Sequence, residues 1–418
     1  MKSCPQLSLR AGELWFEEVS LKAVAEQHGT PAYVYSRRTI VENYRAYRDA
    51  FATCEHLICY AVKANPNLAI LQLLAREGAG FDIVSEGELR RVLAAGGDPG
   101  KVIFSGVGKR ESEIAFALSQ GIACFNVESE AELERIDAVA QRLGRRAPIA
   151  LRVNPDVDAK THPYIATGLK ENKFGVAYAD AERLYRFAAG RPTLEIRGIE
   201  CHIGSMITEL APYQDAIARL LDLVDRLAQA GIALEHIDVG GGRAIVYRDE
   251  EVAPIERFAE MIRRQLGQRR LRLLLEPGRS IVGNAGLLLT RIELLKPGPS
   301  RNFAVVDAAM NDLIRPTLYG AYHAVVEVAP RAAPSLTYDI VGPVCESGDW
   351  LARDRPLSAQ AGDLLAILGA GAYGMTMASN YNSRLRPCEL LVDGEKVHVI
   401  RERERFEELI AGERLIEG

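Results

Sequence analysis

The sequence has no excess of positive charge and no long apolar run. Lys and Arg number 51 against 56 Asp and Glu, for a formal net charge of −5, so the composition does not favour binding to nucleic acid or an anionic membrane. No segment approaches the roughly 20 continuous apolar residues of a membrane span. The first residues, M-K-S-C-P-Q-L-S-L-R, lack the apolar core of a secretory signal. We therefore expect a cytoplasmic protein that binds neither nucleic acid nor a membrane.

Cysteine is scarce and its spacing is irregular. The seven cysteines are scattered, with no C-x-x-C pair, which argues against a disulfide framework or a structural zinc site. We predict reduced thiols and no metal site. Internal repeats and low-complexity segments are also absent, so ordinary globular domains remain. A chain of 418 residues is too long for one typical domain of ~100–200 residues, and two domains are expected.

A regular alternation of short apolar runs and amphipathic segments occupies residues 37–285. Capping boxes at Ser85-x-x-Glu88 and Ser129-x-x-Glu132 mark two helix starts. The pattern predicts a (β/α)8 barrel. An open doubly wound sheet is the alternative, but no G-x-G-x-x-G opens the first unit. The eight predicted strands are Leu57–Val62, Phe81–Val84, Val102–Phe104, Cys124–Val127, Ile149–Val153, Ile196–His202, His236–Val239 and Leu271–Leu275.

Beyond residue 285 the helical pattern stops. Residues 286–418 predict a mostly antiparallel β-domain that ends in a short charged helix, and residues 1–36 supply a further strand near Tyr33–Tyr35. Asp393-Gly394 forms the expected turn of a hairpin. The predicted strands are Leu287–Leu295, Phe303–Asp307, Ala324–Val328, Leu336–Val341, Leu364–Leu368 and Leu390–Ile400.

One connection within the barrel pattern is unusually long. Residues 154–176 leave a strand end and are polar and rich in helix breakers. Long loops in compact domains are commonly functional. We expect a functional loop here, with a plain surface excursion as the alternative.

Lys63 ends the first apolar run of the barrel pattern. Asn65 and Pro66 follow as an expected helix N-cap and first helical residue. A lysine at the carboxyl end of a barrel strand is placed where such folds carry out chemistry. By itself it is equally compatible with a solvated rim residue, because lysine is mostly exposed.

Other strand ends supply polar groups that give Lys63 a context. Strand two ends in Asp82 and Ser85, strand six in His202, strand seven in Gly240–Gly242 and strand eight in Glu276–Arg279. The glycines can bring backbone N–H groups close to an anion, or they only relieve crowding. Together the groups suit pyridoxal 5'-phosphate. Lysine binds its aldehyde, the glycines its phosphate, the imidazole its ring, and Glu276 the ring nitrogen.

Several motifs, in this order, resemble the diaminopimelate decarboxylases, a family of barrel-type pyridoxal-phosphate enzymes related to alanine racemase and ornithine decarboxylase. The resemblance covers nearly the whole chain. The matching stretches are Y-A-V-K-A-N, N-P-D-V-D-A-K-T-H-P-Y-I-A-T-G-L-K-E-N-K-F-G, C-H-I-G-S, D-V-G-G-G, E-P-G-R, M-N-D-L-I-R-P-T-L-Y, G-P-V-C-E-S-G-D and G-A-Y-G-M-T-M-A-S-N-Y-N.

The resemblance implies a role for each matching residue. Lys63 is the expected Schiff-base lysine, His202 stacks on the cofactor ring, and Cys345 is the proton donor. The cofactor phosphate is expected to contact Ser205, Gly241, Gly242 and the residues of the E-P-G-R motif: Glu276, Pro277, Gly278 and Arg279.

The substrate of the family is meso-2,6-diaminopimelate, which loses CO2 to give L-lysine at the last step of lysine biosynthesis. Its far carboxylate is expected at Arg279, Arg315 and Tyr319, and its far ammonium at Glu346. Tyr373 contacts both cofactor and substrate. The family forms a head-to-tail homodimer, so Cys345 and Glu346 are expected to act in the partner's site.

Two positions depart from the family pattern. Met206 stands where glutamine is common, and Glu86 where glycine is common. The alternatives to the expected activity are a decarboxylase of another diamino or basic amino acid, an amino-acid racemase, or a non-catalytic pyridoxal-phosphate protein. Cys345-Glu346 speaks against a racemase, and Arg279, Arg315 and Tyr319 favour a substrate with a far carboxylate.

Overall fold

The structure is a computed structural model and describes residues 4–158 and 172–416. The chain divides into two compact units. The barrel unit comprises Asn43–Ala244 and Glu251–Ser280, and the β-unit comprises Met1–Glu42, Ile245–Glu250 and Ile281–Gly418. None of the helices among the described residues is both long and apolar enough to cross a membrane.

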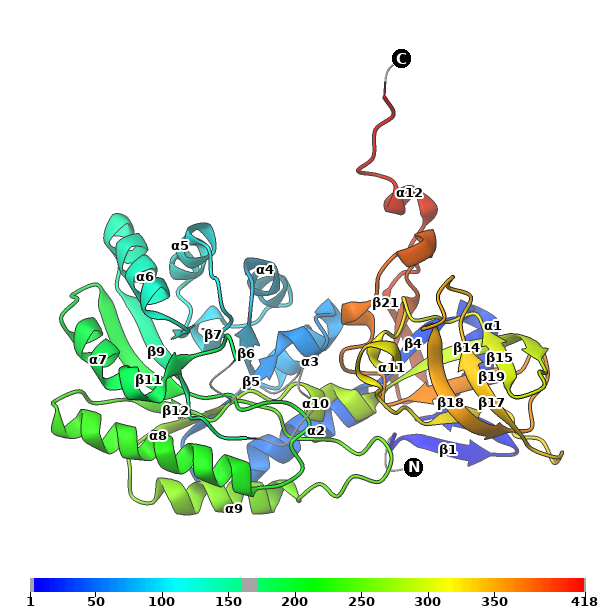
Figure 1. The fold of residues 1–418 in the computed structure, drawn as a ribbon, viewed down its shortest axis with the longest axis horizontal. Coiled ribbons are helices and arrows are strands. Elements are labelled where there is room, and N and C mark those ends of the chain that lie inside the picture. Colours follow the sequence, from blue (N-terminus) through cyan, green and yellow to red (C-terminus); the bar gives the residue numbers. More distant parts are fainter. Residues whose placement is uncertain (1–3, 159–171, 417–418) are drawn as a thin grey trace. The chain divides into compact units, whose positions relative to one another are not determined.

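The barrel unit is a closed ring of parallel strands surrounded by helices (Figure 1). Each strand pairs with the next, and the last pairs with the first through Leu273–Leu275 and His56–Ile58. The predicted barrel is confirmed, and the open sheet is excluded because the first and last strands pair. The ring consists of β5 (His56–Ala61), β6 (Gly80–Ile83), β7 (Val102–Phe104), β8 (Cys124–Val127), β9 (Ala147–Asn154), β11 (Leu194–Glu200), β12 (His236–Asp238) and β13 (Arg272–Leu275).

The helices follow the strands in alternation. Ser85 and Ser129 cap two of them, each accepting the backbone N–H of the glutamate three residues later, as the capping boxes predict. The helices are α3 (Leu68–Arg76), α4 (Glu86–Ala94), α5 (Glu111–Gln120), α6 (Glu130–Leu143), α7 (Tyr178–Ala189), α8 (Ala211–Gln229) and α9 (Ile255–Leu266), with the short β10 (Val176–Ala177) beside β9.

The predicted helix start after Lys63 is wrong by two residues. Lys63 lies in a 3-10 turn, Val62–Ala64, and Asn67 caps α3 by accepting the Ala69 N–H at 3.0 Å. The Asn65 side chain instead accepts the N–H of Asn67 at 3.2 Å. Asparagines on both sides of Pro66 are equally good caps by type, so the pattern does not distinguish them.

The β-unit is built on a twisted, mostly antiparallel sheet, as predicted. Its strand order is β18-β17-β15-β14-β4-β20-β21, with β19 bridging β14 and β16. β4 (Ala32–Ser36) joins this sheet between β14 and β20, which confirms that the strand near Tyr33 belongs to the β-domain. The pairs β4–β20 and β15–β17 are parallel. The apolar core lies under this sheet and includes Val34, Leu287, Leu289, Leu368 and Leu390.

The remaining elements of the β-unit include four strands that the sequence did not predict: β1, β2, β3 and β18. β18 reads W-L-A-R-D-R-P-L, and its charged outer face and proline conceal the strand. The elements are β1 (Leu7–Arg10), β2 (Glu13–Phe16), β3 (Val19–Ser20), α1 (Leu21–His28), β14 (Gly286–Lys296), β15 (Asn302–Val306), α11 (Arg315–Tyr319), β16 (Val325–Glu327), β17 (Leu336–Val341), β18 (Trp350–Leu357), β19 (Leu364–Leu368), β20 (Cys388–Asp393), β21 (Lys396–Arg401) and α12 (Phe406–Leu409). Helices α2 (Arg37–Ala50) and α10 (Arg279–Val282) begin in one unit and end in the other.

The predicted functional loop at 154–176 lies partly outside the described residues, since 159–171 are not described.

Candidate active site

Lys63 lies just beyond the carboxyl end of β5. Its ammonium forms an ion pair with the fully buried carboxylate of Asp82, a residue of the neighbouring strand β6. The Lys63 side chain is 36% exposed. The lysine is therefore held at the catalytic end of the barrel by a buried anion while part of its side chain stays accessible.

His202 follows β11 and is fixed by the glycine loop. Its Nδ1 accepts the backbone N–H of Gly241 at 3.1 Å, so the proton of the neutral ring is on Nε2. Burial, together with the charges of Arg152 and Lys63, holds the pKa of His202 well below its ordinary value. The ring is a neutral, oriented plane, which suits stacking better than proton transfer.

Gly240–Gly242 form a turn whose backbone conformation and close contacts disfavour any residue with a Cβ. Gly240 and Gly242 have φ of +69° and +92°. A Cβ at Gly241 would lie 2.1 Å from the Glu276 carbonyl oxygen, and one at Gly242 would lie 2.0 Å from the Gly204 carbonyl oxygen. The backbone segments after β11, β12 and β13 therefore approach each other closely, as a cradle for an anion requires.

A cluster of buried carboxylates lies at the ends of β6, β11, β12 and β13. Burial raises the pKa of Asp238 to about 7 and that of Glu200 to about 8. Burial also raises the pKa of Glu276 well above its ordinary value, and the charges of Asp82, Asp238 and Glu200 add to this effect. The cluster retains protons near neutral pH unless a cation is placed against it.

Arg152 on β9 partly neutralises these carboxylates. Its guanidinium lies 3.0 Å from Glu128 and 3.6 Å from Glu200, and it covers the Phe174 ring at 4.8 Å. One Nη donates to the His202 carbonyl oxygen at 3.5 Å. Sequence reasoning missed Arg152 and Glu200. Each is a charged residue within an otherwise apolar predicted strand, and that pattern could have indicated a buried ion pair.

The loop after β13 closes the same site. Arg279 donates to the Ser205 hydroxyl at 3.1 Å, and the Pro277 carbonyl accepts the N–H of Ala61 at 3.1 Å. A Cβ at Gly278 would lie 2.9 Å from the Ala64 Cβ. The strand-eight loop thus packs directly on the turn that carries Lys63.

Cys345 and Glu346 form a separate group in the β-unit. Both are exposed. The Cys345 N–H donates to Asn382 Oδ1 at 2.9 Å, and Tyr381 donates its hydroxyl to Glu346 at 2.6 Å. The buried Asp349 fixes the loop by accepting the N–H of Val344 at 2.7 Å. Tyr381 and Asn382 lie in the N-Y-N motif, to which the sequence assigned no role.

Arg315, Tyr319 and Tyr373 also belong to the β-unit. Arg315 and Tyr319 begin and end α11, and Arg315 is buried. Tyr373 has φ of +55°, an uncommon conformation for a residue with a side chain and one that concentrates at functional sites. The predicted site residues thus fall into two sets. The barrel unit brings together Lys63, His202, Ser205, Gly241, Gly242, Glu276, Pro277, Gly278 and Arg279, and the β-unit holds Arg315, Tyr319, Cys345, Glu346 and Tyr373.

The two departures from the family pattern have different surroundings. Met206 has φ of +66° and precedes the bridge between Ile207 and Arg243. Glu86 lies in the first turn of α4 and pairs with Arg90 at 2.6 Å. A carboxylate there is favoured by the helix dipole.

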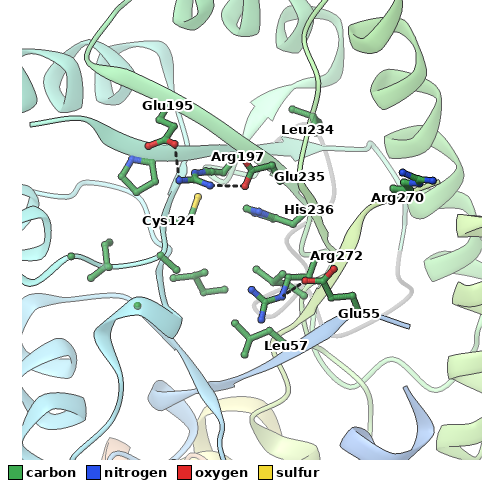
Figure 2. Close-up of a pocket in the computed structure, with 17 residues that line it drawn as sticks. Glu55, Leu57, Cys124, Glu195, Arg197, Leu234, Glu235, His236, Arg270 and Arg272 are labelled. Atoms are coloured by element: carbon green, nitrogen blue, oxygen red, sulfur yellow. Dashed lines mark hydrogen bonds and ion pairs between the residues drawn. The ribbon is translucent and has the colours of Figure 1, made fainter. Parts of the chain in front are cut away.

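A pocket of about 630 Å³ lies at the opposite, amino-terminal, end of the barrel strands. Figure 2 shows Arg197 between Glu195 and Glu235, and Arg272 beside Glu55. In barrels of this kind that end contributes to stability and the carboxyl end to chemistry. We place the candidate site at Lys63.

The chain is similar to proteins of known activity over nearly its full length. Residues 37–283 match the family model "Pyridoxal-dependent decarboxylase, pyridoxal binding domain". A diaminopimelate decarboxylase from Pseudomonas aeruginosa is 58% identical over 409 residues, which is 98% of this chain and 99% of that protein. The structure of diaminopimelate decarboxylase from Helicobacter pylori complexed with L-lysine has a TM-score of 0.91 and 43% identity over 93% of this chain and 98% of that one. The enzyme from M. jannaschii in complex with L-lysine has a TM-score of 0.95 and 37% identity over 100% and 99% of the two chains.

The barrel residues fit pyridoxal phosphate. Lys63 offers an amine for the aldehyde, and the turn at Gly241 leaves no room for a Cβ, as close approach of backbone to a phosphate requires. His202 presents a neutral ring. Glu276 is a buried acid that a protonated ring nitrogen would keep ionised.

Gly241→Ala is expected to weaken cofactor binding by about 5- to 150-fold, because a Cβ forced against the Glu276 carbonyl displaces the cradle at a cost of roughly 1–3 kcal/mol. The measurement is the Kd for pyridoxal phosphate by absorbance titration. Gly87→Ala is the matched control, since its Cβ would meet only the Ser85 hydroxyl, at 3.7 Å. Equal affinities for the two variants would contradict the role of the loop.

Asp238→Asn is expected to reduce the pH dependence of stability in the cofactor-free protein. The folded pKa of Asp238 is about 7, above the ~3.9 of an unfolded Asp. The folded state then binds more protons between these values, and the free energy of unfolding falls as pH rises from about 4 to about 7. Over that window, the free energy of unfolding of the variant should fall by at least about 1.4 kcal/mol less than that of the unaltered protein.

Urea unfolding followed by circular dichroism at several pH values measures this slope. The exposed Asp215→Asn is the control and should unfold with the slope of the unaltered protein. An Asp238→Asn slope equal to that of the control would show that Asp238 titrates normally.

Proposed function

Because the chain belongs to the pyridoxal-dependent decarboxylases, and within them to the diaminopimelate decarboxylases, we propose that it converts meso-2,6-diaminopimelate to L-lysine and CO2, the last step of lysine biosynthesis. The observation that carries the proposal is the meeting of Lys63, the Gly241 turn and buried Glu276 at one end of the barrel. Bound pyridoxal phosphate supplies an electron sink for the electron pair left when CO2 departs.

Residues 37–285 are assigned to cofactor binding. Lys63 holds the cofactor aldehyde, and Asp82 keeps the lysine oriented through their ion pair. Ser205, Gly241, Gly242 and the loop Glu276–Arg279 hold the phosphate, with Arg279 placed by its hydrogen bond to Ser205. His202 lies against the ring. Glu276 pairs with the ring nitrogen, and the negative charges of its neighbours favour a protonated nitrogen there.

The substrate is recognised by its far end. Arg279, Arg315 and Tyr319 bind the far carboxylate, because planar guanidinium groups pair with carboxylates through two N–H groups. Glu346 binds the far ammonium, and Tyr373 contacts substrate and cofactor. A diamino acid without a far carboxylate would lose the arginine contacts. We therefore propose that the site prefers diaminopimelate over other basic amino acids.

Cys345 delivers the proton that replaces the departing carboxylate. Its thiol gives a proton to the carbon that has lost CO2, and a proton from solvent restores it. The requirement for a thiol, and the seven free cysteines of the described residues, support a reducing cytoplasm as the location.

Cys345 and Glu346 are proposed to complete the site of a second copy in a homodimer. Both side chains are exposed in the single chain, whereas protonation of a reacting carbon is best shielded from bulk water. A partner's barrel mouth would provide that shield. A dimer with two-fold symmetry forms two such sites.

Lys63→Ala is expected to remove CO2 release from meso-diaminopimelate and the visible absorption of the bound cofactor. The unaltered protein and the variant are incubated with pyridoxal phosphate and a panel of amino acids, and CO2 is measured. Lys101→Ala, which replaces another barrel lysine whose Nζ lies 3.4 Å from the Gly78 carbonyl oxygen, should keep full activity. Normal CO2 release by Lys63→Ala would contradict the role of Lys63. Faster CO2 release from another amino acid by the unaltered protein would identify that amino acid as the substrate instead.

Mixing Lys63→Ala chains with Cys345→Ala chains tests the shared site. Cys345→Ala alone should bind cofactor normally and lose at least about 100-fold in rate. If the two residues of a site come from different subunits, each mixed dimer regains one intact site. About half of the randomly paired dimers are mixed, so the mixture should regain about a quarter of the unaltered activity. Mixtures as inactive as the separate variants would place both residues of a site in one chain.

A further inference from the structure

His323 is a fully buried histidine of the β-unit that lies between α11 and β16. Its Nε2 lies 2.8 Å from an Nη of Arg315, and its Nδ1 lies 2.8 Å from the Leu368 carbonyl oxygen. Neither the sequence motifs nor the family resemblance assigns this residue a role. Its two ring nitrogens nevertheless connect a proposed substrate-binding arginine to the rigid strand β19.

The partners of His323 fix its protonation state. A guanidinium has donors only, so the ring nitrogen that faces Arg315 must accept and carries no proton. A carbonyl oxygen accepts only, so Nδ1 must carry the proton and donate to Leu368. The ring is therefore neutral, in the Nδ1–H tautomer, and both of its nitrogens are committed.

Tyr247 closes the other side of this arrangement. The Arg315 guanidinium carbon lies 4.7 Å from the Tyr247 ring centroid, within the range of a cation–π contact. The His323 and Tyr247 rings meet edge to face at 5.3 Å and 78°. The guanidinium is thus held by one ring nitrogen and one aromatic face, which restrict the rotation that a long arginine side chain otherwise has.

We propose that His323 is a positioning residue for substrate recognition. As a neutral Nδ1–H imidazole it accepts an N–H of Arg315 and aims the rest of the guanidinium at the far carboxylate of the substrate. The inference rests on the proposed function in that the carboxylate is the one of diaminopimelate. It adds a device that couples substrate affinity to pH.

Acid disrupts the arrangement. A protonated His323 has two N–H donors and would present one of them, with a positive charge, to Arg315. Among the described residues, the charged or titratable groups placed against His323 include Arg315 on α11 and Tyr247. Arg355 on β18 donates to the His323 carbonyl oxygen at 3.3 Å. The two arginines make a second cation unfavourable. Protonation therefore releases Arg315, and substrate affinity falls as pH falls.

The kinetic test uses the holoenzyme and meso-diaminopimelate between about pH 5 and about pH 8, a range that extends below the ordinary histidine region because the two arginines disfavour a charged ring. His323→Phe keeps a flat ring but has no acceptor, and KM is expected to rise at least about tenfold while kcat changes less than about threefold. His323→Gln restores one acceptor and one donor and should bring KM back to within about threefold of the unaltered enzyme. The KM of the unaltered enzyme should rise on acidification, and that of His323→Gln should not.

Two controls separate positioning from folding. Each variant is checked for stoichiometric pyridoxal phosphate, which a structural defect would lower. His398→Gln replaces an exposed histidine on β21 and should leave KM and its pH profile unchanged. An unaltered KM in both His323 variants, or a pH-independent KM in the unaltered enzyme, overturns the proposal.

The tautomer gives a readout that does not depend on activity. In a sample with 15N-labelled histidine, NMR should show His323 neutral with its proton on Nδ1, the signal being identified by its loss in His323→Gln. A charged ring at neutral pH, or a proton on Nε2, overturns the proposal even if the enzyme is active. If the Nδ1–H form is found but no CO2 is released from diaminopimelate, the proposed function fails and the assignment of the Arg315–His323 contact stands.

Discussion

Burial of negative charge at the carboxyl end of the barrel is the constraint on which the rest of the site depends. Asp82, Glu200, Asp238 and Glu276 are all buried, and unpaired charges in such a place cost far more than ordinary packing recovers. Lys63 offsets Asp82, and Arg152 offsets Glu200. The remaining carboxylates, Asp238 and Glu276, would be stabilised by a cationic group held against Glu276. Stability is given up at the place where the chemistry needs a strong field.

The two units of the enzyme hold different kinds of candidate site residues. The barrel unit is rich in buried titratable groups and close glycine contacts, which under the proposed function orient a rigid cofactor. The β-unit presents Arg315, anchored through His323, and the exposed pair Cys345 and Glu346. Under the proposed function, recognition of the far carboxylate combines Arg279 of the barrel unit with Arg315 and Tyr319 of the β-unit, and Cys345 of the β-unit delivers the proton. A change at Arg315 or Tyr319 would then alter substrate choice without changing a residue of the cofactor cradle.

The sequence predicted the scaffold well because apolar runs and helix caps are local signals. All eight barrel strands, the caps at Ser85 and Ser129 and the β4 strand are present. The cap at Asn65 was wrong because Asn67 offers the same chemistry two residues later. Arg152 and His323 were missed for a different reason. Each matters through partners that are distant in sequence, such as Glu200 or Leu368, and a single polar residue in an apolar context carries no local pattern. The roles of the site residues stay predictions, carried by the family resemblance.

The strand pairings also decide how late in synthesis the chain can complete its structure. The barrel closes only when β13 pairs with β5, and β4 finds its parallel neighbour only at β20, where Cys388 lies opposite Ala32. Nearly the whole polypeptide must leave the ribosome before the strand that precedes the barrel is secured on both edges. Until then β4 has an exposed edge of the kind that recruits other chains. Folding of this protein is therefore expected to be slow.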